Sequence, residues 1–424
     1  MKRRHFIQAA GAGAVLASTV GCASIGGAAR PQVVVVGGGY GGATAARYIR
    51  IWSEGAIDVT LIEPNGGFIS CPLSNLVLGG SMQIADLTMG YEDLASRHGV
   101  RIVHDTVAAI DADKRTVALA GGQTLAYERL IVSPGVDFLW DLLPGMRRPG
   151  AQDAVLHAWK AGAQTVALRA QLEAMPDGGV FVLTIPPAPY RCPPGPYERA
   201  SQVAYYFSRA KPKSKVLVLD ANEDVVSKGV LFKRIWKERY PQMIEYRPGF
   251  LAADVDAGTR TVMSELGDQV KADVLNVIPP QRAGSIALQS GLANVNGRWC
   301  GVDFLTFEST QAKNIHVLGD AIQSAPLMPK SAHMANQHAK VCAAAVVDLL
   351  SGRAPDAKPM LTNTCYSFVS DQDVIHVASV HAYDADKKTL LVVPGSGGLS
   401  PGPSTLEGEY ALNWARNIWA DTLR

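Results

Sequence analysis

A glycine-rich turn between two short apolar segments most constrains how this 424-residue chain can fold. Residues 33–36 form a β-branched apolar run typical of a buried parallel strand, and Gly37, Gly39 and Gly42 follow it in the spacing G-x-G-x-x-G. In this motif the first glycine makes the tight turn, the second lets the backbone approach a pyrophosphate, and the third lets helix and strand pack closely. A second apolar run, residues 58–62, ends at Glu63, where a carboxylate accepts hydrogen bonds from an adenosine ribose. Together these features predict a dinucleotide-binding unit.

A second motif favours FAD over NAD as the dinucleotide. The apolar run 315–318 leads into Gly319-Asp320, and two-dinucleotide flavoproteins use such an Asp to hold the flavin ribityl chain. A helix predicted over residues 332–350 can point its positive end at the flavin ring, where negative charge grows on reduction. The alternative interpretation is that Asp320 only caps a helix. The motif Val-Ser-Pro-Gly at 132–135 adds Ser133 and Gly135 to the predicted cofactor-binding residues.

Length and composition indicate a globular α/β protein of several domains. A chain of 424 residues is too long for one core, and its 47% hydrophobic and 18% charged residues are those of a folded protein. The formal net charge of +2 gives no indication of nucleic-acid binding. Further strand-like runs lie at 101–104, 130–133, 180–184, 215–219 and 274–278.

The predicted fold has two Rossmann-like domains and a smaller α+β domain. Residues 31–155 and 276–352 would form an FAD domain, interrupted by a central α/β domain at 156–275. Residues 353–424 would form a C-terminal interface domain of short strand-like runs and turns, ending in an amphipathic stretch at 407–424.

The first 30 residues are typical of a twin-arginine export signal, which predicts a periplasmic protein. Arg3 and Arg4 precede an apolar run at 9–21 that is too short for a membrane span. A frayed N-terminal helix is one alternative, and lipid attachment at Cys22 is another. No later segment is long and apolar enough to predict a transmembrane span.

The central domain lacks the glycine motif that a pyridine-nucleotide reductase would carry after its first strand. Its place is taken by Pro-Pro-Ala-Pro-Tyr-Arg-Cys-Pro-Pro-Gly-Pro-Tyr-Glu-Arg at 186–199. Proline offers no N–H to a phosphate, so NAD(P)H is not expected to be the electron donor. The loop is instead predicted to hold Cys192 rigidly beside Arg191, whose charge favours a thiolate, and near Glu198, which can carry a proton. A purely structural cysteine in a stiff loop is the alternative.

The six cysteines give no sign of a metal or of a haem on this chain. None begins a C-x-x-C-H sequence, which argues against c-type haem attachment, and no Cys or His pair has zinc-site spacing. His333 and His338 lie five residues apart on the predicted helix and so do not share a face. Cys342 is predicted to lie in the core, and Cys300 has no assigned role.

At these residues the chain closely resembles the flavoprotein subunit of flavocytochrome c sulfide dehydrogenase, within the glutathione-reductase-like flavoproteins. The resemblance extends from residue 33 to near the C-terminus. It includes Val-Val-Gly-Gly-Gly at 35–39, Leu-Ile-Glu-Pro-Asn at 61–65, Arg-Cys-Pro-Pro-Gly-Pro-Tyr-Glu-Arg-Ala at 191–200, Ile-Pro-Pro-Gln-Arg-Ala-Gly at 278–284, Met-Pro-Lys-Ser at 328–331 and Asn-Thr-Cys-Tyr-Ser at 363–367. The proline-cysteine loop is the most specific of these motifs.

The resemblance implies oxidation of sulfide to sulfur or polysulfide, with electrons passed to a cytochrome c subunit that carries the haem. It implies a redox disulfide between Cys192 and Cys365, and a thioether from Cys71 to the FAD. Pro72 departs from the family pattern beside that cysteine, while the following Leu-Ser-Asn is kept. Val107 and Lys330 are also predicted to contact the cofactor.

Two other functions remain open from the sequence. A sulfide:quinone oxidoreductase has similar cysteine chemistry, but it would need a quinone channel and an interfacial helix, for which the charged stretch 407–424 is a weak candidate. A flavoprotein partner without turnover, in a thiosulfate-oxidising system, would have the same fold.

Overall fold

The computed structural model describes residues 30–424. Residues 1–29, which hold the twin-arginine pair and Cys22, lie outside the described residues, so the predictions made for them are not addressed by the fold.

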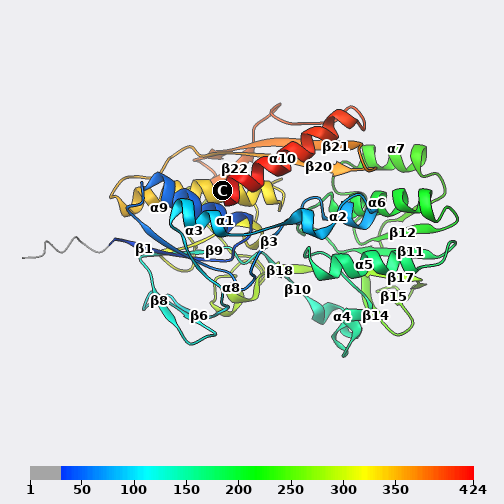
Figure 1. Cartoon of the computed structure of the whole chain (residues 1–424), viewed down its shortest axis with the longest axis horizontal. Coiled ribbons are helices and arrows are strands. Elements are labelled where there is room, and N and C mark those ends of the chain that lie inside the picture. The colour runs from blue at the N-terminus through cyan, green and yellow to red at the C-terminus, as the bar shows by residue number, and fades with distance from the viewer. Residues whose placement is uncertain (1–29) are drawn as a thin grey trace, which may run out of the picture. The chain divides into compact units, whose positions relative to one another are not determined.

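A five-stranded parallel sheet carries the glycine turn (Figure 1). Its strand order is β19 (Ile315–Val317), β9 (Arg129–Val132), β1 (Gln32–Val36), β2 (Asp58–Ile62) and β5 (Arg101–Val103). Helices α1 (Tyr40–Trp52) and α9 (Ala332–Leu350) pack against each other on one face. The predicted strands and the predicted helix over 332–350 are confirmed. Short, fully apolar runs form the strands because helices cover the faces of a parallel sheet and bury its side chains.

A second parallel sheet lies in the central part of the chain. Its order is β13 (Ile244–Arg247), β12 (Lys215–Asp220), β11 (Val180–Ile185) and β17 (Val274–Val277). Helices α5 (Ala163–Ala174), α6 (Gly195–Ala210) and α7 (Gly229–Arg239) share its core. The two parallel sheets confirm the predicted fold class, whereas the residue boundaries of the domains stay a prediction.

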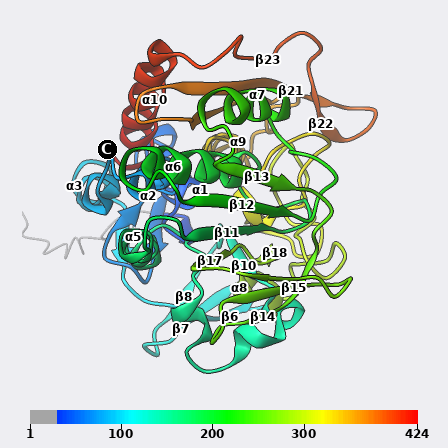
Figure 2. The same cartoon turned by 90° about the vertical axis from the view of Figure 1, so that its right-hand side faces the viewer.

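The C-terminal part is an antiparallel sheet with one long helix beside it (Figure 2). It comprises β20 (Met360–Phe368), β21 (Val374–Asp384), β22 (Thr389–Val392), β23 (Gly398–Leu399) and α10 (Thr405–Leu423). The prediction of short strands here was wrong for β20 and β21, which are 9 and 11 residues long. The two strands pair without interruption from Met360 to Phe368. The length of each strand therefore depends on its partner, which the local sequence does not reveal.

The remaining elements connect or flank these sheets. They are β3 (Phe68–Ile69), α2 (Ser74–Gly79), β4 (Thr88–Met89), α3 (Glu92–His98), β6 (Val107–Asp111), β7 (Thr116–Leu119), β8 (Thr124–Ala126), β10 (Val136–Phe138), α4 (Ala151–Ala154), β14 (Ala252–Asp256), β15 (Thr261–Ser264), β16 (Gln269–Lys271), β18 (Gln281–Ala283) and α8 (Ser285–Gln289). The antiparallel pair β10–β18 lies where the chain leaves and re-enters the first sheet. Within residues 30–424, no helix has the length and apolar character needed to cross a bilayer.

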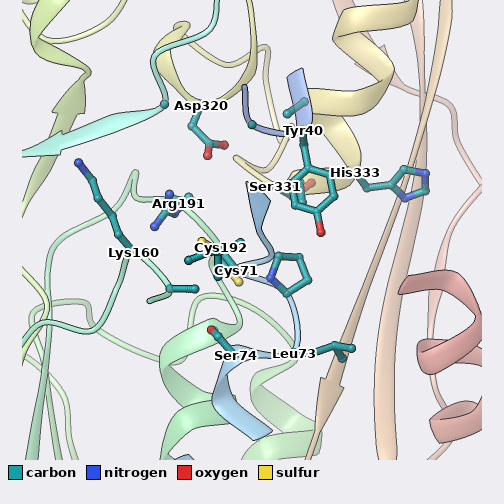
Figure 3. A pocket seen from close by; sticks show the side chains of 18 of the residues that line it. Tyr40, Cys71, Leu73, Ser74, Lys160, Arg191, Cys192, Asp320, Ser331 and His333 are labelled. Atoms are coloured by element: carbon teal, nitrogen blue, oxygen red, sulfur yellow. The ribbon is translucent and has the colours of Figure 1, made fainter. Parts of the chain in front are cut away.

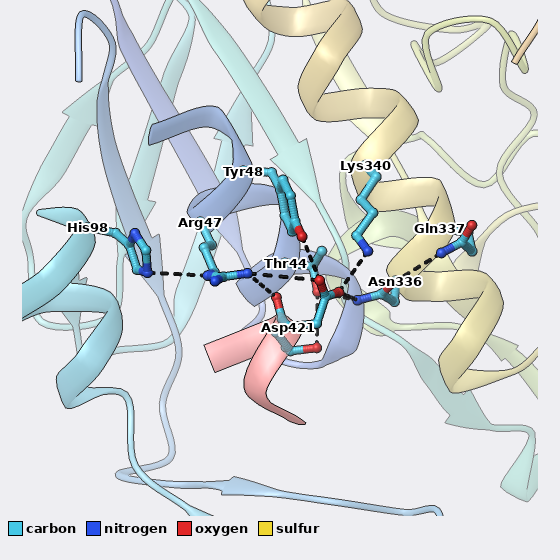
Figure 4. A network of polar contacts seen from close by, with 9 residues as sticks. Thr44, Arg47, Tyr48, His98, Asn336, Gln337, Lys340 and Asp421 are labelled. Atoms are coloured by element: carbon cyan, nitrogen blue, oxygen red, sulfur yellow. Dashed lines mark hydrogen bonds and ion pairs between the residues drawn. The ribbon is translucent and has the colours of Figure 1, made fainter. Parts of the chain in front are cut away.

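A polar network fastens α10 to α1 and α9 (Figure 4). The carboxylate of Asp421 accepts hydrogen bonds from Tyr48 Oη at 2.5 Å and Asn336 Nδ2 at 2.7 Å, and it pairs with Lys340 Nζ at 2.8 Å. Burial raises the pKa of Asp421, but the hydrogen bonds from Lys340, Tyr48 and Asn336 outweigh burial and hold it below its usual value. The network therefore stabilises the docked helix only while Asp421 is ionised.

Replacing Asp421 by Asn should lower the free energy of unfolding by about 1–3 kcal/mol, because a carboxylate bonded to three donors loses its charge. The folded-state pKa of Asp421 is depressed, so its contribution is present above the unfolded pKa and disappears as pH falls through the folded pKa. Urea unfolding of both proteins at neutral and acidic pH measures this difference. D111N removes an exposed carboxylate paired with Lys114, and it should leave stability almost unchanged because water screens the pair. Equal effects of the two substitutions would contradict the assignment.

Candidate functional site

One cavity of about 510 Å³ lies at the carboxyl ends of the first parallel sheet, within the ~300–1,000 Å³ usual for cofactor sites. The segments that follow four of its strands contribute Gly38 after β1, Glu63 after β2, Ser133 after β9 and Asp320 after β19. The carboxyl edge of a parallel sheet, at the point where strand order reverses, is where such folds bind ligands. The other walls come from the Cys71 loop, the proline loop, the start of α9, strand β20 and helix α10 (Figure 3).

The glycine turn leaves no room for side chains at its ends and leaves space in its middle. Gly37 has φ +95°, and a Cβ on Gly42 would lie 1.8 Å from the carbonyl oxygen of Gly37. A Cβ on Gly39 would meet no protein atom within 4 Å. Gly42 is therefore required by the close contact of α1 with β1, whereas the space at Gly39 is free for a ligand, as the motif predicts.

Glu63 is held beside the turn by the backbone. Its Oε2 accepts from Gly38 N–H at 2.7 Å, and its Oε1 accepts from the backbone and side-chain N–H groups of Asn65 at 3.0 and 2.6 Å. Tyr91 Oη donates to the carbonyl of Gly38 at 3.0 Å. Asn65 and Tyr91 line the cavity and were not predicted as site residues. Asn65 stands in the Leu-Ile-Glu-Pro-Asn motif, whereas Tyr91 reaches the turn only through folding.

Asp320 faces the cavity with an unsatisfied oxygen. Its Oδ1 is buried without a hydrogen-bond partner, and Figure 3 shows the carboxylate directed toward the cavity. Burial raises the pKa of Asp320, against the charges of Arg191 and Lys330. A buried unpaired carboxylate oxygen is costly unless a ligand hydroxyl meets it, and a ribityl chain supplies such hydroxyls. The residues present therefore fit an FAD.

Of the other predicted cofactor residues, Ser133, Gly135 and Cys71 line the cavity, and Val107 and Lys330 do not. Val107 packs in the core of the first sheet. The Lys330 ammonium donates to the carbonyls of Asp320 and Ile322 and lies 3.7 Å from the centre of the Trp299 ring. Burial lowers the pKa of Lys330 to about 7. Lys330 thus braces the Gly-Asp turn, and direct contact of Val107 or Lys330 with a cofactor stays a prediction.

The proline loop fixes Cys192 in the cavity wall. Cys192 has φ +58°, its N–H donates to the carbonyl of Lys330 at 2.8 Å, and its own carbonyl accepts from Gly195 N–H at 2.8 Å. A Cβ on Gly195 would lie 2.8 Å from Cys192 Sγ, so the position needs glycine. Two backbone hydrogen bonds thus hold Cys192 in the cavity wall, while the rigidity expected from the prolines stays a prediction.

Arg191 favours the thiolate of Cys192, in the direction that its place in the sequence indicates, but it is not the largest influence on the pKa of that thiol. Burial is the largest cause that raises the pKa of Cys192, and the charges of Cys365 and Glu198 raise it further. The cations Arg191 and Lys228 lower this pKa, but by less. Adjacent cations in the sequence do not reveal how deeply a thiol is buried.

Glu198 is also buried, at the first turn of α6. Its Oε2 accepts from Asn75 Nδ2 at 2.9 Å and its Oε1 from Phe368 N–H at 2.9 Å. Burial raises the pKa of Glu198, and the hydrogen bonds from Phe368 and Asn75 oppose this without reversing it. A carboxyl with a raised pKa is suited to hold and release a proton. Its partner Asn75, which follows the Cys71 loop, was not predicted.

Cys365 completes a set of three cysteines in the same cavity. It lies on β20 with its Sγ 3.4 Å from Asn363 Nδ2, while Cys71 comes from the loop before α2 and Cys192 from the proline loop. The charge of Cys365 raises the pKa of Cys192, and the charges of both thiols raise the pKa of Lys228. Both cysteines are free thiols in this structure. Folding thus brings together residues separated by more than a hundred positions.

Within the described residues, the remaining cysteines and histidines named in the sequence analysis lie in the core or hydrogen-bond to the backbone. Cys300 and Cys342 are buried in the core of the first sheet. His333 accepts a hydrogen bond from Thr364 N–H, and His338 from Gly319 N–H. No group of three or more His, Cys, Asp or Glu side chains in residues 30–424 is placed to hold a metal ion.

Three family models match the chain. Residues 31–175 match the pyridine nucleotide-disulphide oxidoreductase model, residues 165–279 match "sulfide dehydrogenase (flavocytochrome c) flavoprotein chain, central", and residues 357–423 match "flavocytochrome c sulphide dehydrogenase, flavin-binding". The chain is 54% identical over 46 residues to the sulfide dehydrogenase (flavocytochrome c) flavoprotein chain of Chlorobaculum thiosulfatiphilum, a match that covers 11% of this chain and 94% of that sequence.

More distant relatives match over longer stretches. The mitochondrial sulfide:quinone oxidoreductases of Dictyostelium discoideum and Mus musculus are 24% and 23% identical, and each match covers 68% of this chain and only 65% of the relative. The crystal structure of the sulfide:quinone oxidoreductase of Aquifex aeolicus has a TM-score of 0.75 at 17% identity, covering 92% of this chain and 91% of that one, which is a likeness of fold.

The fold and the cavity define a flavoprotein of the two-dinucleotide-domain, pyridine nucleotide-disulphide oxidoreductase class. Within that class, the chain belongs to the family of the flavocytochrome c sulfide dehydrogenase flavoprotein chain.

Replacing Gly39 by Ala should weaken FAD binding about tenfold or more while leaving the fold stable, because its Cβ would occupy only the space reserved for the ligand. Flavin absorbance per chain and thermal unfolding of the apoprotein measure the two effects separately. G398A, in open space on β23, is the matched control and should alter neither. The comparison is made in a C71S background, so that the expected thioether cannot retain the flavin. Full flavin content of G39A in that background would mean that the cofactor does not approach this turn.

Proposed function

We propose that this protein oxidises sulfide through a Cys192–Cys365 disulfide and a bound FAD, and delivers the electrons to a cytochrome c subunit that carries the haem. The observation that carries the proposal is the meeting of Cys71, Cys192 and Cys365 on one cavity with the glycine turn. Family membership supports the same chemistry.

The cysteine pair suits a small sulfur nucleophile. Hydrosulfide attacks one sulfur of the disulfide, the S–S bond breaks, and the products are a persulfide on one cysteine and a thiolate on the other. Glu198 lies among the charges that act on Cys192 and, through its raised pKa, can take up or release the proton that accompanies this exchange. A bound flavin supplies an acceptor that can take two electrons and release them singly.

The central domain supports an electron donor other than NAD(P)H. In the second sheet, the loop after β11 has prolines and Cys192 where a nucleotide-binding turn would have glycines, and the first turn of α6 faces the cavity through Gly195, Glu198 and Arg199. Export to the periplasm by the twin-arginine route remains part of the proposal and is based on residues 3–4 and the apolar run that follows.

A second candidate is sulfide oxidation with a quinone as acceptor, as the names of the Dictyostelium discoideum and Mus musculus relatives state for those proteins. The cysteine chemistry would be the same, so only the acceptor separates the two functions. A partner subunit without turnover is the third outcome.

Sulfide titration of the holoprotein with cytochrome c and with a soluble quinone, side by side, tests the proposal. Cytochrome c reduction should be the faster reaction, and NADH alone should leave the flavin oxidised. C192S and C365S should each lose about a hundredfold or more of the sulfide-dependent rate, because either substitution removes the disulfide. C342A, in the core of α9, should retain the rate. Unchanged rates in C192S and C365S would eliminate the disulfide mechanism, and no turnover in any assay would favour the non-catalytic partner.

Acid denaturation of the purified protein should leave the flavin on the chain if Cys71 forms the thioether. C71S should release its flavin completely under the same conditions, whereas C365S should not, because only Cys71 is proposed as the tether. The absorbance of the precipitate and of the supernatant shows where the flavin is, and the mass of the peptide that contains Cys71 shows whether flavin is attached to it. Flavin found wholly in the supernatant of the unsubstituted protein would remove this part of the proposal.

A further inference from the structure

A buried lysine lies directly behind Cys365, outside the cavity. Lys228 immediately precedes α7, has φ +58° and is 5% exposed. Its ammonium donates to the carbonyl of Cys365 at 2.8 Å, to Ser367 Oγ at 2.8 Å and to the carbonyl of Ile375 at 3.4 Å. A cation from the central part of the chain is thus fixed on the strand that carries Cys365.

All three hydrogen-bond acceptors of Lys228 are neutral, and the ionisable groups that act on its pKa lie farther away. In order of their effect on its pKa, these are Cys365 on β20, Glu198 on α6, Cys192 on the proline loop and Glu407 on α10. Two of the four are the thiols of the proposed redox pair. Burial lowers the pKa of Lys228 to about 8, so the side chain is charged at neutral pH.

The charge of Lys228 therefore matters most when the disulfide is open. A closed disulfide is neutral, whereas its cleavage by hydrosulfide places one negative charge on a buried sulfur. The reduced thiols have raised pKa values because of burial, and Lys228 is the first group that opposes this at Cys365. At Cys192 it acts in the same direction, after Arg191.

We propose that Lys228 is a positioning residue for sulfide oxidation: it anchors the strand of Cys365 through two hydrogen bonds and places a fixed positive charge where the released thiolate forms. The proposal rests on the proposed function of the cysteine pair. If only its hydrogen bonds mattered, Lys228 would have a structural role. An effect of its charge on the thiolate is what distinguishes a positioning role from that.

The test is the rate of Cys365 alkylation by iodoacetamide at pH 7, where Lys228 is charged, in the dithiothreitol-reduced holoprotein, followed by peptide mass spectrometry. K228M should slow this reaction about tenfold, because loss of the cation disfavours the thiolate. K228Q keeps hydrogen-bond donors without the charge and should give the same slowing, and it serves as the second variant if K228M does not fold. K228R should restore the rate.

Two controls separate charge from anchoring. S367A removes one hydrogen bond of Lys228 but keeps its charge, so its alkylation rate at pH 7 should match that of the unsubstituted protein. K233M removes an exposed lysine of α7 that pairs with Asp224, and it should change nothing. Equal alkylation rates of K228Q and the unsubstituted protein would overturn the proposal, as would an equal slowing in S367A. Failure of the proposed function would be seen separately, as full sulfide turnover in C365S.

Discussion

The cavity depends on one residue that joins three segments of the chain. The carbonyl of Lys330 accepts a hydrogen bond from the N–H of Cys192, and its ammonium donates to the carbonyls of Asp320 and Ile322. The proline loop, the Asp320 turn and the start of α9 therefore share one anchor. Because each contact is directional, a shift in any of the three segments would leave a polar group unsatisfied, so the proline loop is held against the Asp320 turn.

Much of this arrangement is local enough to be predicted from sequence. The apolar run, the glycine spacing and Glu63 determine the first βαβ unit, since each acts on neighbours within about 30 residues. The prolines around Cys192 predict a rigid loop for the same reason. The roles of Lys228, Asn75 and Tyr91 have no such signal, because their partners lie 50 to 140 positions away and are ordinary polar groups. The length of β20 likewise depends on its pairing with β21.

Charge near the cysteines shows why burial must be known before chemistry is assigned. Arg191 precedes Cys192 in the sequence and would by itself favour a thiolate. In the folded protein, removal from water dominates for both thiols and for Glu198, so all three have raised pKa values. Burial of this kind disfavours the charged form of each of the three groups, so the nearby cations Arg191 and Lys228 have more effect on a charge that forms there.

The network around Asp421 has a consequence for how the cavity is assembled. Its bond to Tyr48 joins residues 373 positions apart, so the docking of α10 on α1 closes almost the largest loop that this chain can form. Loop-closure entropy disfavours such contacts until the intervening sheets exist. The wall that Ala411 and Trp414 contribute therefore depends on contacts that are favourable only once those sheets are in place, whereas Gly42 meets Gly37 only five residues away.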